Sequence, residues 1–288
     1  MIKTHKINWQ HCLSHQLWPA IEKGWQDEGT PVHFFWGLAG NNIREIQRCI
    51  DYGIEWWYVD VGYLTKQITR YPEPKIHDYD KTYFRICKGN IHTIRCKVGD
   101  GTRVSKLESQ GIDCLFKGWG GGETKHILLA PSSPTVTHHI NGMTQEKWVD
   151  EVTHEIRKHT DMPIWFRPHP RFRSNIKETK TNNVHISFPK KIGDVDEVDF
   201  NNVLKNAYAV INYNSNPAIE SVLAGVPVYV AKSSLCWPVG KEIGTDLKIP
   251  AKPDRTQWLE QISYTEWLTE EIEKGVPWRR LKQNLIDG

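Results

Sequence analysis

The sequence predicts an α/β protein built from two Rossmann-like lobes, with parallel sheets and helices on both faces. Short apolar runs alternate with amphipathic stretches of helical period along most of the 288 residues. That length corresponds to about two domains. Four glycines fall within five residues between 117 and 123, and no helix or strand interior suits them. We therefore expect an N-terminal Rossmann-like lobe over 1–122 and a second, C-terminal lobe over 123–255. Helices over 256–288 are expected to pack back between the lobes.

The first lobe begins with the order of strands and helices that is typical of a βαβ unit. A helical stretch from His11 to Gln26 precedes an apolar strand over 32–36, and a glycine-rich turn follows it. Asn41 is then expected to cap a helix that carries isoleucines at helical spacing. Two more strands are predicted over 55–60 and 82–86.

The second lobe shows a clearer alternation of strands and helices. Strands are predicted over 125–130, 163–167, 209–213 and 226–230, and helices over 144–159, 199–205 and 217–224. Such an alternation is typical of a parallel sheet covered on both faces.

The composition is that of an ordinary folded protein, with 39% hydrophobic and 25% charged residues and a net charge of +3. The 13 tryptophans could fill cores or stack bases and sugars, and core packing is the expected use. Six scattered cysteines form no CxxC pair, so neither a zinc site nor a disulfide framework is expected. The sequence shows no secretion signal and no apolar run long enough to span a membrane, which predicts a cytoplasmic protein.

Polar residues cluster after three of the predicted strands of the second lobe. Ligands of open α/β sheets bind beyond the carboxyl ends of the strands, so the loops after Ala130, Arg167 and Tyr213 should converge on one crevice. Hydroxyls, cations and a helix N-terminus together suit a diphosphate. The candidate ligands are Ser132, Ser133, Arg167, His169, Arg171, Asn214, Ser215 and Asn216.

Two motifs carry a resemblance to a known class of enzyme. The segment NSNPAIESVLAGVPV, from Asn214 to Val228, resembles the donor-site element of GT-B glycosyltransferases. By this resemblance Ser215 and Asn216 hold phosphate and Glu220 holds the ribose hydroxyls; the other interpretation is an ordinary αβ turn with a solvated Glu220. The RPHPR segment from 167 to 171 is similar to segments of bacterial capsule, Kdo-type and teichoic-acid-type transferases, or is simply a proline-stiffened loop.

The resemblance covers residues 163–228 and implies a GT-B glycosyltransferase, a hexosyl- or pentosyltransferase, that uses a nucleotide sugar, with a UDP-sugar as the first expectation. No tightly bound cofactor is expected. Asp194-Val-Asp196 has the spacing of a metal–diphosphate motif but falls in a polar stretch, so we interpret it as solvated and expect no metal site. Asp60, at the end of a predicted strand, and His92 are the alternative catalytic bases; either residue could instead be a satisfied structural group.

The first lobe suggests what the acceptor is. The stretches around Phe34–Gly40, Tyr58–Tyr63 and Tyr83–Ile86 resemble small phage-encoded proteins linked to glycosylation of DNA bases. A 5-hydroxymethylated pyrimidine of phage DNA is therefore the leading acceptor, which would place the enzyme in the cytoplasm of an infected host. A run of basic residues with aromatic residues nearby could line a path for the DNA, which is a polyanion, or it could be a solvated face of this lobe. Its members are Arg85, Lys88, His92, Arg95, Lys97 and Arg103, with Tyr83, Phe84 and Trp119.

Three other functions stay open. A capsule or wall polysaccharide transferase would share the RPHP and Glu220 motifs. A sugar-nucleotide epimerase of the same architecture would consume the nucleotide sugar without an acceptor. A phage protein that binds a nucleotide without turnover is the non-enzymatic alternative. The sequence does not predict the oligomeric state.

Overall fold

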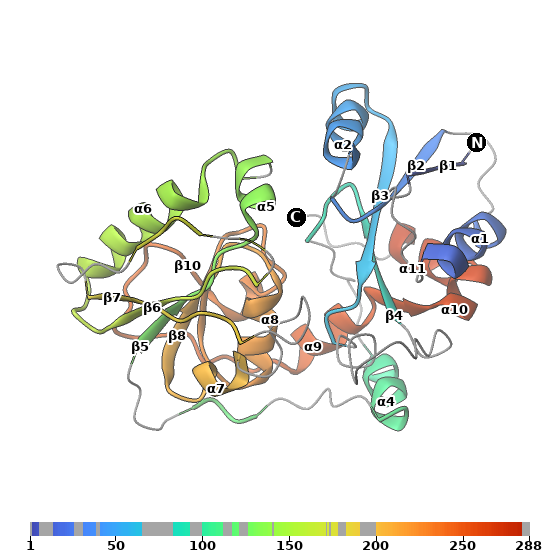
Figure 1. Ribbon diagram of the computed structural model, residues 1–288. Helices are drawn as coiled ribbons and strands as arrows, with labels where there is room; N and C mark the ends of the chain where they lie inside the picture. Colours follow the sequence, from blue (N-terminus) through green and yellow to red (C-terminus); the bar gives the residue numbers. More distant parts are fainter. Residues whose placement is uncertain are drawn as a thin grey trace. The chain divides into compact units, whose positions relative to one another are not determined.

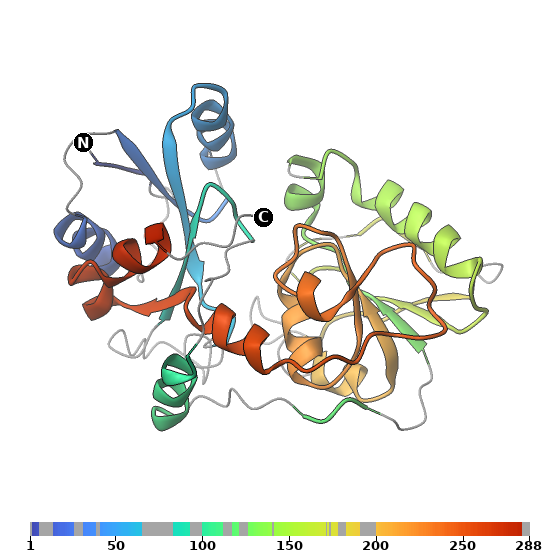
Figure 2. The ribbon, with the colours of Figure 1, turned by 180° about the vertical axis from the view of Figure 1, so that it is seen from behind.

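The computed structural model describes residues 2–5, 14–25, 31–38, 41–64, 83–92, 100–111, 117–120, 126–139, 141–170, 172, 174–177, 183–190 and 200–283. The chain divides into two compact units (Figures 1 and 2). Unit 1 comprises residues 1–114 together with 256–288, and unit 2 comprises residues 115–255. The division thus falls after Cys114, earlier than the glycine-rich segment, and the C-terminal segment is part of unit 1.

The described part of unit 1 contains a five-stranded sheet in the order β1-β2-β3-β4-β11. Its strands are β1 (Ile2–His5), β2 (Val32–Trp36), β3 (Glu55–Val61), β4 (Tyr83–Lys88) and β11 (Glu266–Leu268). The first three strands are parallel, whereas β4 is antiparallel to both β3 and β11. The prediction of an entirely parallel sheet is therefore wrong for this unit, because an apolar run indicates that a strand is buried but not in which direction it runs.

The helices of unit 1 come from both ends of the chain. They are α1 (Ser14–Gly24), α2 (Asn42–Asp51), α4 (Thr102–Ser109), α9 (Thr256–Ser263), α10 (Thr269–Glu273) and α11 (Val276–Gln283). In Figure 1 the blue α1 lies beside the red α10. A Cβ atom on Gly24 would lie 1.8 Å from the carbonyl oxygen of Ile272, so only glycine permits this approach.

Aromatic side chains fill the core of unit 1. The rings of Trp25, Phe34, Trp57 and Trp278 pack together, edge to face for Trp25–Phe34 and for Trp57–Trp278 with centroids 5.3 Å apart, and stacked for Phe34–Trp57. The prediction that tryptophan serves core packing is confirmed for these residues. Asn41 occupies the N-cap position of α2, but its side chain makes no capping hydrogen bond.

Unit 2 contains a six-stranded sheet in the order β10-β9-β8-β5-β6-β7, among the residues that the structure describes. Its strands are β5 (His126–Leu129), β6 (Ile164–Phe166), β7 (Val184–Ile186), β8 (Ala207–Ile211), β9 (Val228–Val230) and β10 (Lys241–Glu242). Every pair of neighbours is parallel. The parallel sheet predicted for this half of the chain is confirmed.

Helices cover both faces of this sheet (Figures 1 and 2). They are α5 (Pro134–His139), α6 (Gln145–Arg157), α7 (Phe200–Leu204) and α8 (Asn216–Leu223), with a 3-10 turn at Trp237–Val239. The face of α6 that carries Trp148, Val152 and Ile156 packs on the sheet core, as its spacing predicts. Gly225 ends α8 with φ at +81°, and a Cβ atom there would lie 2.2 Å from the carbonyl oxygen of Gly118.

Candidate functional site

The strand order of unit 2 contains a switch point. From β5 the chain moves to β6 and β7 on one side, and then crosses to β8, β9 and β10 on the other side. The loops that leave the neighbouring strands β5 and β8 therefore diverge, and such a switch point is where open α/β sheets hold their ligands. Here the two loops are residues 130–133 and 212–215.

Two buried asparagines join these loops. The Nδ2 of Asn212 donates to the carbonyl oxygen of Ala130 at 2.6 Å. Asn214 accepts from the hydroxyl of Ser132 at 3.2 Å and donates to the hydroxyl of Ser233 at 3.3 Å. Asn212, Asn214 and Ser132 are all buried. Ser132 and Asn214, both candidate ligands from the sequence, thus bind each other within the protein and hold the two loops together.

Other candidate residues are half-exposed and remain accessible to a ligand. Ser133 accepts from the backbone N–H of Val136 at 3.3 Å and so caps the first turn of α5. Ser215 is the N-cap residue of α8, but its side chain makes no capping hydrogen bond. Asn216 and Glu220 lie on the first two turns of α8 and are also half-exposed. The structure therefore gathers Ser215, Asn216 and Glu220 at the start of one helix.

The RPHP segment follows β6, the neighbour of β5. Arg167 is buried and donates from Nη1 to the carbonyl and hydroxyl oxygens of Ser187, at 3.3 and 2.9 Å. His169 is half-exposed, with its ring centroid 5.1 Å from that of Phe172. Arg171 lies outside the described residues. Arg167 is thus fixed at the carboxyl edge of the sheet by the end of the adjacent strand β7.

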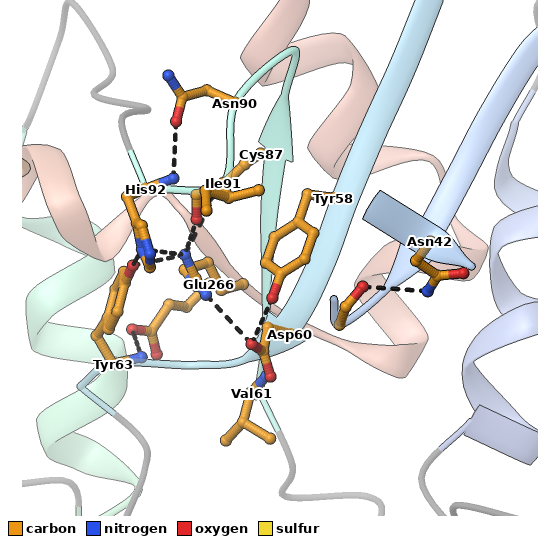
Figure 3. A network of polar contacts seen from close by, with 12 residues as sticks. Asn42, Tyr58, Asp60, Val61, Tyr63, Cys87, Asn90, Ile91, His92 and Glu266 are labelled. Atoms are coloured by element: carbon orange, nitrogen blue, oxygen red, sulfur yellow. Dashed lines mark hydrogen bonds and ion pairs between the residues drawn. The ribbon is translucent and has the colours of Figure 1, made fainter. Parts of the chain in front are cut away.

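In unit 1, Asp60 lies at the end of β3 and is held by three donors (Figure 3). The hydroxyl of Tyr58 donates to Oδ2 at 2.8 Å, and the backbone N–H of Val61 donates to Oδ1 at 2.8 Å. Nη2 of Arg85 lies 3.4 Å from Oδ2. The side chain of Asp60 is 35% exposed, whereas that of Arg85 is 3% exposed. The carboxylate of Asp60 is thus accessible to solvent, whereas the guanidinium of Arg85 is not.

Arg85 links Asp60 to His92. Its Nη1 donates to the hydroxyl of Tyr63 at 2.5 Å and also to the carbonyl oxygen of Ile91. The Tyr63 hydroxyl lies 2.8 Å from Nδ1 of His92. Figure 3 shows this contact as a dashed line. Burial and the charge of Arg85 hold the pKa of His92 well below its usual value, so this imidazole is neutral at pH 7. Nη1 of Arg85 also lies 3.4 Å from Nδ1 of His92.

The C-terminal segment completes this network through β11. Arg85 pairs with Asp60 on β3 and with Glu266 on β11, so the three side chains lie on one face of the sheet. Glu266 is fully buried and accepts from the backbone N–H groups of Tyr63 and Leu64 at 2.5 and 2.7 Å. It thereby fixes the loop that follows β3. Sequence reasoning missed Glu266, because no local pattern brings residue 266 to residue 63. It also missed Tyr58 as a donor to Asp60.

The basic run expected to line a DNA path is in part buried. Arg85 and Arg103 are 2% and 5% exposed. Arg103 donates to both carboxylate oxygens of Glu271 and to the carbonyl oxygen of Glu266. Trp119 belongs to unit 2, where its Nε1 donates to the carbonyl oxygen of Pro253. The prediction that these two arginines line a surface path is wrong; Arg95 and Lys97 lie outside the described residues.

Among the residues that the structure describes, no three His, Cys, Asp or Glu side chains are grouped so that they could hold a metal ion. Asp194 and Asp196 lie outside this part of the chain. No helix in the described ranges is long and apolar enough to cross a membrane.

The architecture is that of an α/β protein of two Rossmann-like units with a GT-B-like fold. A structure of Thermosulfurimonas dismutans KpsC, described as a beta Kdo 2,7 transferase, is similar with a TM-score of 0.52 and 12% identity. The match covers 97% of this chain and 99% of that one. A second KpsC structure from this organism, the beta Kdo 2,4 transferase, has a TM-score of 0.50, 10% identity and 88% coverage of each chain. At such identities the likeness shows the fold alone. No known family and no curated protein matches the sequence.

Proposed function

We propose that the chain is a glycosyltransferase that moves a sugar from a nucleotide-sugar donor to a hydroxyl acceptor, and that unit 2 binds the donor. The observation that carries this proposal is the switch point between β5 and β8. There the buried Ser132 and Asn214 join the loops, while Ser133, Ser215 and Asn216 stay half-exposed. Loops that are held together by buried residues and that present accessible polar groups suit the binding of a nucleotide.

The chemistry of the site follows from its position. The first turn of α8 offers backbone N–H groups and a partial positive charge to the diphosphate, next to Ser215 and Asn216. Glu220, one turn further along, accepts hydrogen bonds from the ribose hydroxyls. Arg167 and His169 add positive charge or donors at the end of β6. A UDP-sugar is the first donor to test. The Kdo transferase activity named for the two KpsC structures supports this reaction class.

Asp60 is the proposed base on the acceptor side. A carboxylate has about four lone-pair sites, and the described donors Tyr58, Val61 and Arg85 occupy three of them. The remaining site can accept the proton of an acceptor hydroxyl. His92 is the weaker candidate, because it is buried and its nitrogen Nδ1 already faces Tyr63.

We favour a glycan hydroxyl as the acceptor over a hydroxymethylated DNA base. A DNA path needs several exposed cations, and Arg85 and Arg103 are instead committed to carboxylates inside unit 1. Transfer to a 5-hydroxymethylpyrimidine of phage DNA is the second candidate, since Arg95 and Lys97 add two further cations to the sequence.

Thermal unfolding with UDP, CMP and UDP-sugars tests the donor site. A ligand that binds only the native state at a hundredfold excess over Kd adds about 2.7 kcal/mol to the free energy of unfolding, so Tm should rise. No rise with any nucleotide would overturn the proposal. Binding without turnover would favour a nucleotide-binding protein, and consumption of the nucleotide sugar without an acceptor would favour an epimerase.

A further inference from the structure

Asn212 is the first residue after β8, and it has no solvent-exposed surface. Its backbone N–H donates to the carbonyl oxygen of Tyr229 at 3.0 Å, which continues the pairing of β8 with β9. A ligand at the switch point between β5 and β8 cannot touch a residue that is fully buried. Any effect of Asn212 on a ligand must therefore pass through the groups that it holds.

The side chain of Asn212 makes three hydrogen bonds. Its Nδ2 donates to the carbonyl oxygen of Ala130 at 2.6 Å and to the hydroxyl of Ser215 at 2.8 Å. Its Oδ1 accepts from the backbone N–H of Ser215 at 2.7 Å. Both amide protons and the carbonyl oxygen are thus used. A carboxylate lacks the two donors, and a hydroxyl cannot reach all of these partners at once, so only an amide of this size fits.

These bonds determine how Ser215 is presented. A serine at an N-cap normally turns its hydroxyl toward the first turn of its own helix. The hydroxyl of Ser215 instead accepts from Asn212, and it accepts no capping hydrogen bond from the backbone N–H groups of α8. The Ser215 backbone N–H is committed to Asn212 as well. Residue 215 is therefore locked to the end of β5, and the chain enters α8 at Asn216 from a fixed point.

We infer that Asn212 is a positioning residue of the donor site. It holds the β8 loop against the β5 loop, so that Ser215 and Asn216 meet the nucleotide phosphates in one arrangement. This inference rests on the function proposed for the switch point of unit 2. It adds a residue that no motif in the sequence indicates, because the polar contacts of Asn212 all lie inside the protein.

The test uses the full chain and UDP and CMP as probes. Asn212→Ala removes all three side-chain hydrogen bonds, and Asn212→Ser is the smaller change that leaves one hydroxyl to bond. Ser221→Ala is the matched control, because Ser221 is fully buried on α8 and its hydroxyl donates to the carbonyl oxygen of Pro217 at 2.5 Å. Calorimetric titration gives Kd at a temperature where every variant is folded, and thermal unfolding gives Tm.

We expect Asn212→Ala to weaken the binding of UDP or CMP about tenfold or more, a change that a small misplacement of binding groups suffices to cause. Asn212→Ser should lie between this variant and the parent. Ser221→Ala should lower Tm but leave Kd unchanged. A parent that binds a probe while both Asn212 variants bind it equally well overturns the inference and leaves the proposed function intact. A parent that binds neither probe overturns both.

Discussion

Replacing Glu271 by glutamine should destabilise unit 1 strongly, although Glu271 lies on the short helix α10. Arg103 donates to its two carboxylate oxygens at 2.5 and 2.8 Å, and Lys106 donates to Oε1 at 2.6 Å. The side chains of Arg103 and Glu271 are only 5% and 14% exposed. This ion pair joins α4 to the C-terminal segment that supplies β11 and Glu266 to the Asp60 network.

The expected magnitude follows from the pKa of Glu271. Burial by itself raises this pKa, but the hydrogen bonds and charge of Arg103 and the hydrogen bond from Lys106 outweigh it and lower the pKa from 4.5 to about 2. A shift of one pKa unit corresponds to about 1.36 kcal/mol, so the ionised form of Glu271 contributes on the order of 3 kcal/mol to the free energy of unfolding. Because the folded pKa lies below the unfolded one, this contribution is present above pH 4.5 and is lost as the pH falls toward 2.

Glutamine keeps the shape of the side chain but leaves the buried Arg103 without a counter-charge, which costs about 3–5 kcal/mol. Urea unfolding at pH 7, followed by tryptophan fluorescence, measures the loss. Glu270→Gln is the matched control, because the neighbouring Glu270 pairs with Lys274 at the surface and should contribute nothing measurable. Equal urea midpoints for the two variants at pH 7 would refute this reasoning.

Three further predictions concern unit 2 and the acceptor. Arg167→Met should weaken UDP or CMP binding, as calorimetry would show, because it removes a positive charge at the end of β6 that attracts the phosphates, and also the bonds that join β6 to Ser187. Unchanged affinity would exclude Arg167 from the site. Burial lowers the pKa of His126 from 6.5 to about 4, so stability should fall as the pH drops from 6.5 to 4, and His126→Phe should flatten this dependence of the urea midpoint. If DNA is the acceptor, the logarithm of the binding constant should fall with the logarithm of the salt concentration by about 0.9 per phosphate contacted, and Lys97→Glu should make this slope shallower. In a gel-shift assay at two salt concentrations, binding that does not depend on salt, or no detectable binding, would exclude DNA as the acceptor.

The parallel sheet of unit 2 was predictable because its signals are local. The apolar run that becomes β8 is followed by a polar loop, and the helix after it has proline in its first turn and Gly225 just after its end. The mixed sheet of unit 1 was not predictable in the same way. The strand β11 has three residues within a segment expected to be helical, and it forms because β4 presents a free edge to it. Pairing between residues 85 and 266 leaves no trace in sequence periodicity.

The candidate site shows the same limit. The motif around 214–220 predicted which loop would stand at the switch point, since ligand loops follow strand ends. It did not predict that Asn214 and Ser132 would bind each other while Ser215 stays half-exposed. The two arginines 85 and 103 had the sequence signature of a basic surface, yet their carboxylate partners Asp60 and Glu271 bring them into the interior. A sequence shows charges, and only the fold shows how they are paired.

The measurement that tests the account most directly is product analysis by mass spectrometry. The protein is incubated with a panel of nucleotide sugars and with glycan or hydroxymethylated DNA acceptors, beside the variant Glu220→Ala. The account predicts release of the nucleotide and a gain of one glycosyl unit on the acceptor, both sharply reduced in the variant. Consumption of no nucleotide sugar by the parent, or equal turnover by parent and variant, would contradict the central claim that unit 2 holds the donor through α8.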